Sequence, residues 1–298
     1  MALLRALIFA LLLALLLPAW ACAYDVLVVE SRRDPVADEV LRGFRSTRDW
    51  KLRVIPLADY AEVDVARIVR EDRPDLVLTI GDDALAATRS VRQTPVVAVL
   101  SLALRDLYGR RPNLTGVDID LDPNRYLALF EALRRTRVGV IYDPARSGQY
   151  LNRAASHASR YGIDLVERKI RNPKETLGQL AALKGKIDAI WLIPDPTAVT
   201  QQTAESYFLF SQEQQVPVVA FAPVYLRLGA AAVLELDRYD LGRQAGEQAL
   251  RIIRGTPPAA IPLATPRHFL LKSNPSILKH LQIPASALER LAGDRTGP

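Results

Sequence analysis

The sequence predicts an α/β protein built from two similar lobes, each with a sheet of parallel strands. Three strand-like segments of the first half recur in the same order in the second half, beginning 112, 113 and 122 residues later; one such pair is "QTPVVAV" from Gln93 and "QVPVVAF" from Gln215. Solenoid repeats have periods of roughly 20 to 50 residues, so the repeated unit here is a whole lobe. The chain has 298 residues, 49% of them hydrophobic, which is enough for two cores.

Short runs of Val, Ile and Leu alternate with amphipathic stretches through the first half. Continuous apolar strands separated by helices indicate parallel strands that are covered on both faces. The strands are predicted at residues 26–30, 52–57, 76–80 and 96–100. The helices between them are predicted at residues 35–47, 61–71 and 82–91.

The second half repeats this alternation. Its strands are predicted at residues 138–142, 164–167, 189–193 and 218–221, and its helices at 147–161, 173–183 and 198–214. Three further extended pieces, ending near Asp120, Asp237 and Lys272, lead from one half toward the other. We interpret them as crossings between the lobes, which together form a hinge.

The first 23 residues are typical of an export signal. Arg5 precedes an apolar run at 6–17, and Ala21-Cys22-Ala23 is the small-x-small pattern that a signal peptidase recognises. We expect cleavage before Tyr24 and a soluble mature chain. Two alternatives stay open: an uncleaved N-terminal anchor, and lipidation of Cys22, although the residues before this cysteine lack the Leu usual in lipoproteins.

Composition excludes several classes of site. Cys22 is the only cysteine, so neither an intrachain disulfide nor a thiolate zinc cluster can form. The net charge of +6 comes from scattered Lys and Arg, which favours a solvated surface over nucleic-acid binding. His157, His268 and His280 have no spacing typical of a metal pair or a catalytic base, and no phosphate-binding or nucleophile motif is present. We therefore expect no cofactor, no metal site and no enzyme.

Several segments resemble a known family. "NLTGVDID", "RVGVIYDPARSGQ", "DAIWLIPDPT", "VPVVAF", "GAAAVLELDRYDLGRQAGEQALRIIRG" and "PSILKHLQIP" are similar to the ABC-transporter substrate-binding proteins of the periplasmic-binding type I fold, in the branch related to tryptophan-binding components. The resemblance covers nearly all of the mature chain. It implies two Rossmann-like lobes, a hinge of three crossovers and a small ligand closed between the lobes.

The resemblance also implies an organisation and partners. The signal peptide would occupy residues 1–23, the N-terminal lobe 24–118 plus 238–268, and the C-terminal lobe 119–237 plus 269–298. We expect a periplasmic monomer that captures a small polar or amphipathic solute, either amino-acid-like or amine-bearing, and passes it to an ABC permease in the inner membrane. Two alternatives remain: a component that senses its ligand for a signalling receptor, and an enzyme on the same scaffold.

Ligands of open α/β sheets bind outside the carboxyl ends of the strands, which selects the candidate site residues. In the first lobe these are Ser31, Asp82, Asp83 and Ser101. Asp82 and Asp83 begin a helix and suit an ammonium group better than an anion, while the structural alternative for Asp82 is a helix cap. Where the family usually has Gly-Thr-Pro and Asp-Pro, this chain has Gly81-Asp82-Asp83 and Ser101-Leu102, so we expect an amine-bearing solute rather than a standard aromatic amino acid bound in the usual way.

The second lobe matches the family pattern of polar residues at strand ends more closely. Tyr142 is expected to stack on an apolar part of the ligand, and Asp195 to accept an amine. The other candidates are Ser147, Thr197, Phe221 and Asp237. Their alternative roles are those of a core aromatic and of helix caps.

Overall fold

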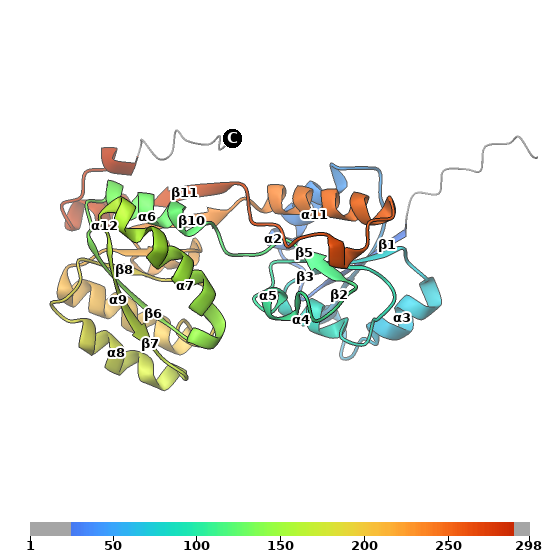
Figure 1. The fold of residues 1–298 in the computed structure, drawn as a ribbon, viewed down its shortest axis with the longest axis horizontal. Coiled ribbons are helices and arrows are strands. Elements are labelled where there is room, and N and C mark those ends of the chain that lie inside the picture. Colours follow the sequence, from blue (N-terminus) through green and yellow to red (C-terminus); the bar gives the residue numbers. More distant parts are fainter. Residues whose placement is uncertain (1–24, 289–298) are drawn as a thin grey trace, which may run out of the picture.

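The computed structural model describes residues 25–288 and contains two α/β lobes that lie side by side (Figure 1). The first sheet has the strand order β2-β1-β3-β4-β5, and every neighbouring pair is parallel. Its strands are β1 (Asp25–Glu30), β2 (Lys51–Pro56), β3 (Leu76–Ile80), β4 (Val96–Val99) and β5 (Leu114–Gly116).

Helices cover both faces of this first sheet. On one face α2 and α11 pack over Val26, Val28 and the other residues that point the same way; on the other face α3, α4 and α5 pack over Leu27 and Val29. The bounds are α2 (Pro35–Arg45), α3 (Val65–Asp72), α4 (Asp82–Ala87), α5 (Leu104–Leu107) and α11 (Arg238–Ile253). Because both faces are buried, the inner strands β3 and β4 are buried along their whole length, whereas the edge strand β2 exposes Lys51 and Arg53.

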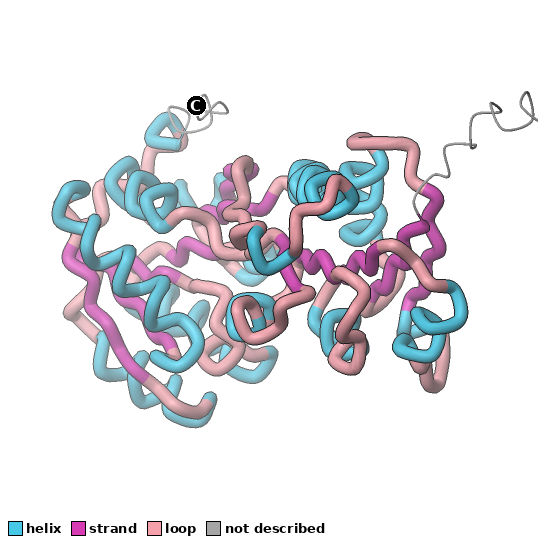
Figure 2. The backbone as a smooth tube through the Cα atoms, turned by 45° about the vertical axis from the view of Figure 1, so that its right-hand side comes forward, coloured by secondary structure: helices cyan, strands magenta, loops and turns pink. Residues whose placement is uncertain are grey.

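The second sheet has the order β11-β10-β9-β8-β6-β7 and is parallel except for the antiparallel edge strand β11. Its strands are β6 (Arg137–Tyr142), β7 (Asp164–Lys169), β8 (Ala189–Trp191), β9 (Val218–Ala220), β10 (Ala232–Leu236) and β11 (Phe269–Ser273). The helices α6 (Pro123–Ala132), α7 (Pro144–Ala158) and α12 (Pro275–His280) cover one face. The other face is covered by α8 (Thr176–Leu183), α9 (Gln201–Gln214) and α10 (Val224–Leu228), and both layers are visible in Figure 2.

The strand order explains the repeated sequence. The β2-β1-β3-β4 portion of the first sheet corresponds to β7-β6-β8-β9 in the second, so the two Pro-Val-Val-Ala segments form β4 and β9 at equivalent inner places. Residues 25–288 also contain the short 3₁₀ helices η1 (Leu57–Asp59), η2 (Ser159–Tyr161), η3 (Pro173–Glu175) and η4 (Pro258–Ala260).

Three segments connect the lobes, after β5, after β10 and before β11. The first and third are joined at Ala264, which donates its N–H to the Gly116 carbonyl and accepts from Asp118 N. The second and third are joined where Asp237 N donates to the His268 carbonyl at 3.3 Å. Backbone pairing therefore links all three segments.

Several helices begin at places that differ from the sequence prediction, because side-chain caps decide the boundary. Helix α7 begins at Pro144 rather than at residue 147, since Asp143 accepts from Ala145 N and proline suits the first turn. Helix α9 begins at Gln201 rather than at residue 198, since Thr200 and Thr203 form a reciprocal capping box. Short helices α5 and α10 lie in segments for which the sequence analysis assigned no helix or strand.

Candidate ligand-binding site

An apolar pocket of about 280 Å³ lies between the lobes at the carboxyl ends of their strands. Its principal lining residues are Leu100, Leu102, Leu121, Tyr126, Val199 and Phe221. Burial, together with the nearby Asp120, raises the pKa of Tyr126, so its hydroxyl stays neutral. The pocket therefore offers two aromatic rings and aliphatic side chains to an apolar group.

A polar pocket of about 220 Å³ adjoins the apolar one and shares Leu102, Ile119, Pro194 and Pro196 with it. Its charged residues are Asp82, Arg105, Asp106, Asp118, Asp120 and Arg146. Four carboxylates thus face two guanidinium groups. This excess of negative charge favours a cationic ligand.

Arg105 is the centre of the polar pocket. Its guanidinium binds Asp118 and, at 2.5 Å, Asp120, two residues that belong to the first crossing between the lobes. Burial is the main cause that raises the pKa of Asp120 to about 6, and neighbouring Asp118 adds to it, while Arg105 opposes the shift. The carboxylate of Asp120 is therefore only partly compensated and can gain from a second positive charge.

An ion pair crosses the polar pocket from one lobe to the other. Arg146 on α7 contacts Asp106 on α5 at 2.9 Å, and about half of each side chain is exposed. Such an exposed pair contributes about 0 to 1 kcal/mol. It can therefore break and re-form at little cost when the lobes move.

In the first lobe, the predicted residues Ser31, Asp82 and Ser101 come together. Ser31 accepts from Ala84 N in the first turn of α4, and Asp82 accepts from the Ser101 hydroxyl at 2.5 Å and from Ala103 N. Gly81 has φ +97°, and a Cβ at this position would lie 2.5 Å from Ser31 Oγ, which explains the glycine. Asp82 lines the polar pocket, whereas Asp83 is exposed and does not line either pocket.

In the second lobe, Asp195 is buried and both of its oxygens already have protein donors. One oxygen accepts from Asp143 N and the Ser147 hydroxyl, at 2.9 and 2.7 Å; the other accepts from Thr197 N and Ala198 N, both at 2.9 Å. These four bonds use the acceptor positions of a carboxylate. The structure thus gives Asp195 a different role from the predicted amine contact, since it fastens the β6–α7 and β8–α9 loops together.

Asp143 completes this network and was not among the predicted site residues. Its second oxygen accepts from the Thr197 hydroxyl at 2.9 Å. Asp195, Ser147 and Thr197 therefore do converge, as neighbouring strand ends require, but mainly to bind one another. Of these three, Asp195 lines the apolar pocket and Ser147 the polar pocket.

Tyr142 does not reach the cleft, and its predicted role is corrected here. Its ring packs in the core with Val138 and Val140, which lie on the same face of β6, and its hydroxyl donates to Glu167 at 2.5 Å. Side chains alternate along a strand, so the last residue of β6 points to the same face as these two valines. Tyr142, although it ends a strand, therefore belongs to the hydrophobic core of the second lobe.

The remaining candidates have contrasting positions. Phe221 lines the apolar pocket, and its ring packs edge-on against Tyr225 with 5.1 Å between centroids. Asp237 lines neither pocket; it caps α11 by accepting from Asp240 N. Its predicted contact with the ligand is therefore replaced by the alternative, a helix cap.

Comparison with known proteins decides the family. A family model for ABC transporter substrate binding proteins matches residues 58–292. The chain belongs to this family. A tyrosine-binding protein of Clostridioides difficile is 25% identical over 223 residues, which are 71% of this chain. The chain spans 64% of the length of that relative.

Solved structures share the fold of this substrate-binding protein. A ligand-free, open substrate-binding protein with adhesive properties from Clostridium difficile has a TM-score of 0.68 at 19% identity, covering 88% of this chain and 95% of its own. A domain from Streptococcus pneumonia in complex with L-Trp has a TM-score of 0.63 at 20% identity, covering 89% and 97%. At identities of 19% and 20%, this similarity shows that the fold is shared.

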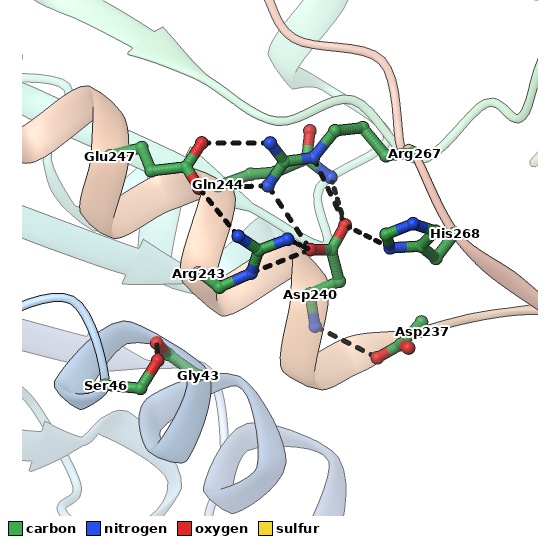
Figure 3. A network of polar contacts seen from close by, with 9 residues as sticks. All are labelled: Gly43, Ser46, Asp237, Asp240, Arg243, Gln244, Glu247, Arg267 and His268. Atoms are coloured by element: carbon green, nitrogen blue, oxygen red, sulfur yellow. Dashed lines mark hydrogen bonds and ion pairs between the residues drawn. The ribbon is translucent and has the colours of Figure 1, made fainter. Parts of the chain in front are cut away.

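A charged network holds the hinge of the substrate-binding protein (Figure 3). The buried carboxylate of Asp240 on α11 accepts from Arg243 at 2.7 Å and from Gln244 at 3.0 Å, and contacts Arg267 and His268 of the third crossing, each at 3.2 Å. Burial alone would raise the pKa of Asp240, but these partners outweigh it and hold the pKa below its ordinary value. The third crossing is thus fastened to the first lobe.

Apart from Asp82, sequence reasoning missed the charged residues of the polar pocket. Arg105 lies in a segment to which no helix or strand was assigned, and Asp118 and Asp120 lie in a crossing for which only connectivity was inferred. The alternation of acids in "VDID" at the point where the chain enters the second lobe was the available signal. Within residues 25–288 no cluster of side chains suited to a metal ion is found, and no helix is long and apolar enough to cross a bilayer.

Proposed function

We propose that this substrate-binding protein captures a small amphipathic amine between its lobes and delivers it to an ABC permease. The observation that supports this proposal is the two-part cleft, in which the apolar and polar pockets share lining residues. Their volumes of 280 and 220 Å³ together fall in the range of small-molecule sites, roughly 300 to 1,000 Å³. One solute can place an aromatic or aliphatic group beside Tyr126 and Phe221 and its ammonium beside Asp120.

The charge balance separates an amine from an amino acid. An ammonium group reduces the negative excess of the polar pocket, whereas a ligand carboxylate adds to it. Two unit charges about 5 Å apart interact by roughly 3 kcal/mol at an effective dielectric constant of about 20. We therefore expect a preference of at least about tenfold for an amine over the amino acid with the same side chain.

Calorimetry with matched ligand pairs tests this proposal. Tyramine and tyrosine differ by one carboxylate, as do tryptamine and tryptophan, so each pair isolates the effect of that charge. We expect both amines to bind more tightly than their amino acids, and Phe221→Ala to weaken the binding of both amines. Tighter binding of tyrosine or tryptophan would overturn the amine inference while leaving the cleft as the site.

Capture is proposed to proceed by hinge closure, with the lobe boundaries at the three crossings near residues 118, 237 and 268. We also propose that export by the N-terminal signal brings the protein to the periplasm. Residues 1–23 and Cys22 lie outside the described residues, so the mass of the processed protein is the test: a chain beginning at Tyr24 supports cleavage, and an acylated Cys22 supports the lipoprotein alternative. Small-angle scattering with and without tyramine tests closure, which predicts a smaller radius of gyration in the complex.

A further inference from the structure

A basic hollow lies at the end of the first lobe opposite the cleft. It encloses about 500 Å³ between the end of α3 and the loop before β4, and Arg70, Arg73 and Arg92 line it together with Ser90 and Thr94. All three arginines are exposed, and no acidic residue lines the hollow. Since these residues precede β3 and β4 whereas the cleft residues follow them, the length of the sheet separates the two sites.

The positive charge of the hollow is not compensated by nearby acids. Glu71 pairs with Arg67 at 2.7 Å, and Asp72 pairs with Arg53, so both carboxylates are already occupied. Within residues 25–288 no hydrogen bond or ion pair engages the side chains of Arg70, Arg73 or Arg92. The three guanidinium groups are therefore available to an anion.

A fourth arginine lies behind this group. Arg111 is buried and binds the carbonyls of Thr88 and Val91, and burial together with the charge of Arg92 lowers its pKa. Its Nε has no hydrogen-bond partner among the described residues. Positive charges thus lie close together here, and a bound anion would reduce the repulsion between them.

Helix dipoles do not explain the arginines. A helix C-terminus carries about half a negative charge, which is far less than three guanidinium groups supply. In the first lobe the last turns of α2, α3 and α11 contain arginine. In the second lobe the last turns of α10 and α12 contain Arg227 and Lys279, whereas α6, α8 and α9 have no basic residue in the last turn. Basic helix ends thus occur in both lobes, and the feature that points to an anion is that three arginines line one hollow.

The basic surface extends well beyond the hollow. Helices α2 and α11 run side by side and both end at this end of the lobe (Figure 1). The exposed arginines that follow or close helices here are Arg42, Arg45, Arg89, Arg110, Arg251 and Arg254. A surface of this width fits a broad anionic partner better than a single small ion.

The described part of the chain begins at this end of the first lobe. Asp25 begins β1 at the same end of the sheet, and it is joined to residues 1–24, whose apolar run at 6–17 is the predicted export signal or, in the alternatives, an anchor next to Cys22. We propose that this basic end docks on the phosphate groups of anionic membrane lipids, with the hollow of Arg70, Arg73 and Arg92 at its centre. Docking would hold the protein near the bilayer.

Vesicle binding of the full chain, as cells process it, tests the proposal. Phosphatidylcholine vesicles with and without phosphatidylglycerol are compared in a sedimentation assay. We expect binding only to the anionic vesicles, with loss at high salt, because screening weakens surface charge interactions. Each arginine near such a surface contributes about 1 kcal/mol, so the triple variant Arg70→Gln/Arg73→Gln/Arg92→Gln should bind about a hundredfold less.

A charge-matched control comes from the second lobe. Arg160→Gln/Arg171→Gln/Lys184→Gln removes the same charge from exposed positions and should bind anionic vesicles nearly as well as the wild type. Equal loss in both triple variants, or no loss in either, would refute the docking surface. Binding of inorganic phosphate to the hollow without any binding to anionic vesicles would instead indicate a soluble anion and would equally overturn the proposal.

Discussion

Replacing Asp195 by alanine is expected to destabilise the second lobe rather than to remove a ligand contact. The substitution leaves three backbone N–H groups and the Ser147 hydroxyl without their acceptor. At about 1 kcal/mol for each hydrogen bond, the free energy of unfolding should fall by about 4 kcal/mol. Asp195→Asn keeps one acceptor oxygen and should lose about half as much.

Urea unfolding followed by tryptophan fluorescence measures this loss. Trp191 is buried in the core of the second lobe and Trp50 in the first. In a chain that begins at Tyr24, and so lacks Trp20, phenylalanine substitution of one isolates the signal of the other. We expect the second-lobe transition of Asp195→Ala to shift to lower urea and the first-lobe transition to stay. Exposed Asp83→Ala serves as the control and should unfold like the wild type.

The opposite outcome is equally clear. If Asp195→Ala unfolds at the wild-type urea concentration but binds tyramine a hundredfold more weakly, Asp195 is a ligand contact and the loop-fastening role is refuted. In that case Asp195→Asn distinguishes charge from hydrogen bonding, because asparagine loses the negative charge completely but keeps one acceptor oxygen.

Three further predictions concern other residues. Tyr142→Phe should lower the free energy of unfolding by about 1 kcal/mol through the lost bond to Glu167 and leave tyramine affinity unchanged; a weakened affinity would return Tyr142 to the site. Calorimetry should show tyramine binding weaken about tenfold per pH unit below about pH 6, as Asp120 gains a proton, and Asp120→Asn should remove this dependence. Asp240→Asn should lower the free energy of unfolding by about 3 kcal/mol at pH 7. Because the native pKa of Asp240 lies below its ordinary 3.8, its stabilisation is present above that value and is lost as the pH falls further, so denaturation curves of variant and wild type should converge in acid.

The sequence determined the architecture and the location of the cleft. Strands that are buried on both faces must be apolar throughout, so their runs of Val, Ile and Leu, and the repeat of those runs, predicted two parallel sheets before any contact was known. Since ligands bind at the carboxyl ends of parallel strands, the same pattern selected Asp82 and Phe221, which line the pockets.

Only the tertiary structure decided what each polar side chain does there. In a strand covered on both faces, apolar residues occupy either side, so the sequence does not show whether Tyr142 points to the core or to the cleft. The predicted amine contact of Asp195 is replaced by hydrogen bonds from donors on its own loop and on a loop 52 residues earlier in the sequence. Arg105, Asp118 and Asp120 come together from a short helix and a crossing, neither of which has a periodic pattern. Hydrogen bonds and ion pairs depend on distances between segments remote in the chain, and those distances are set by how the lobes pack.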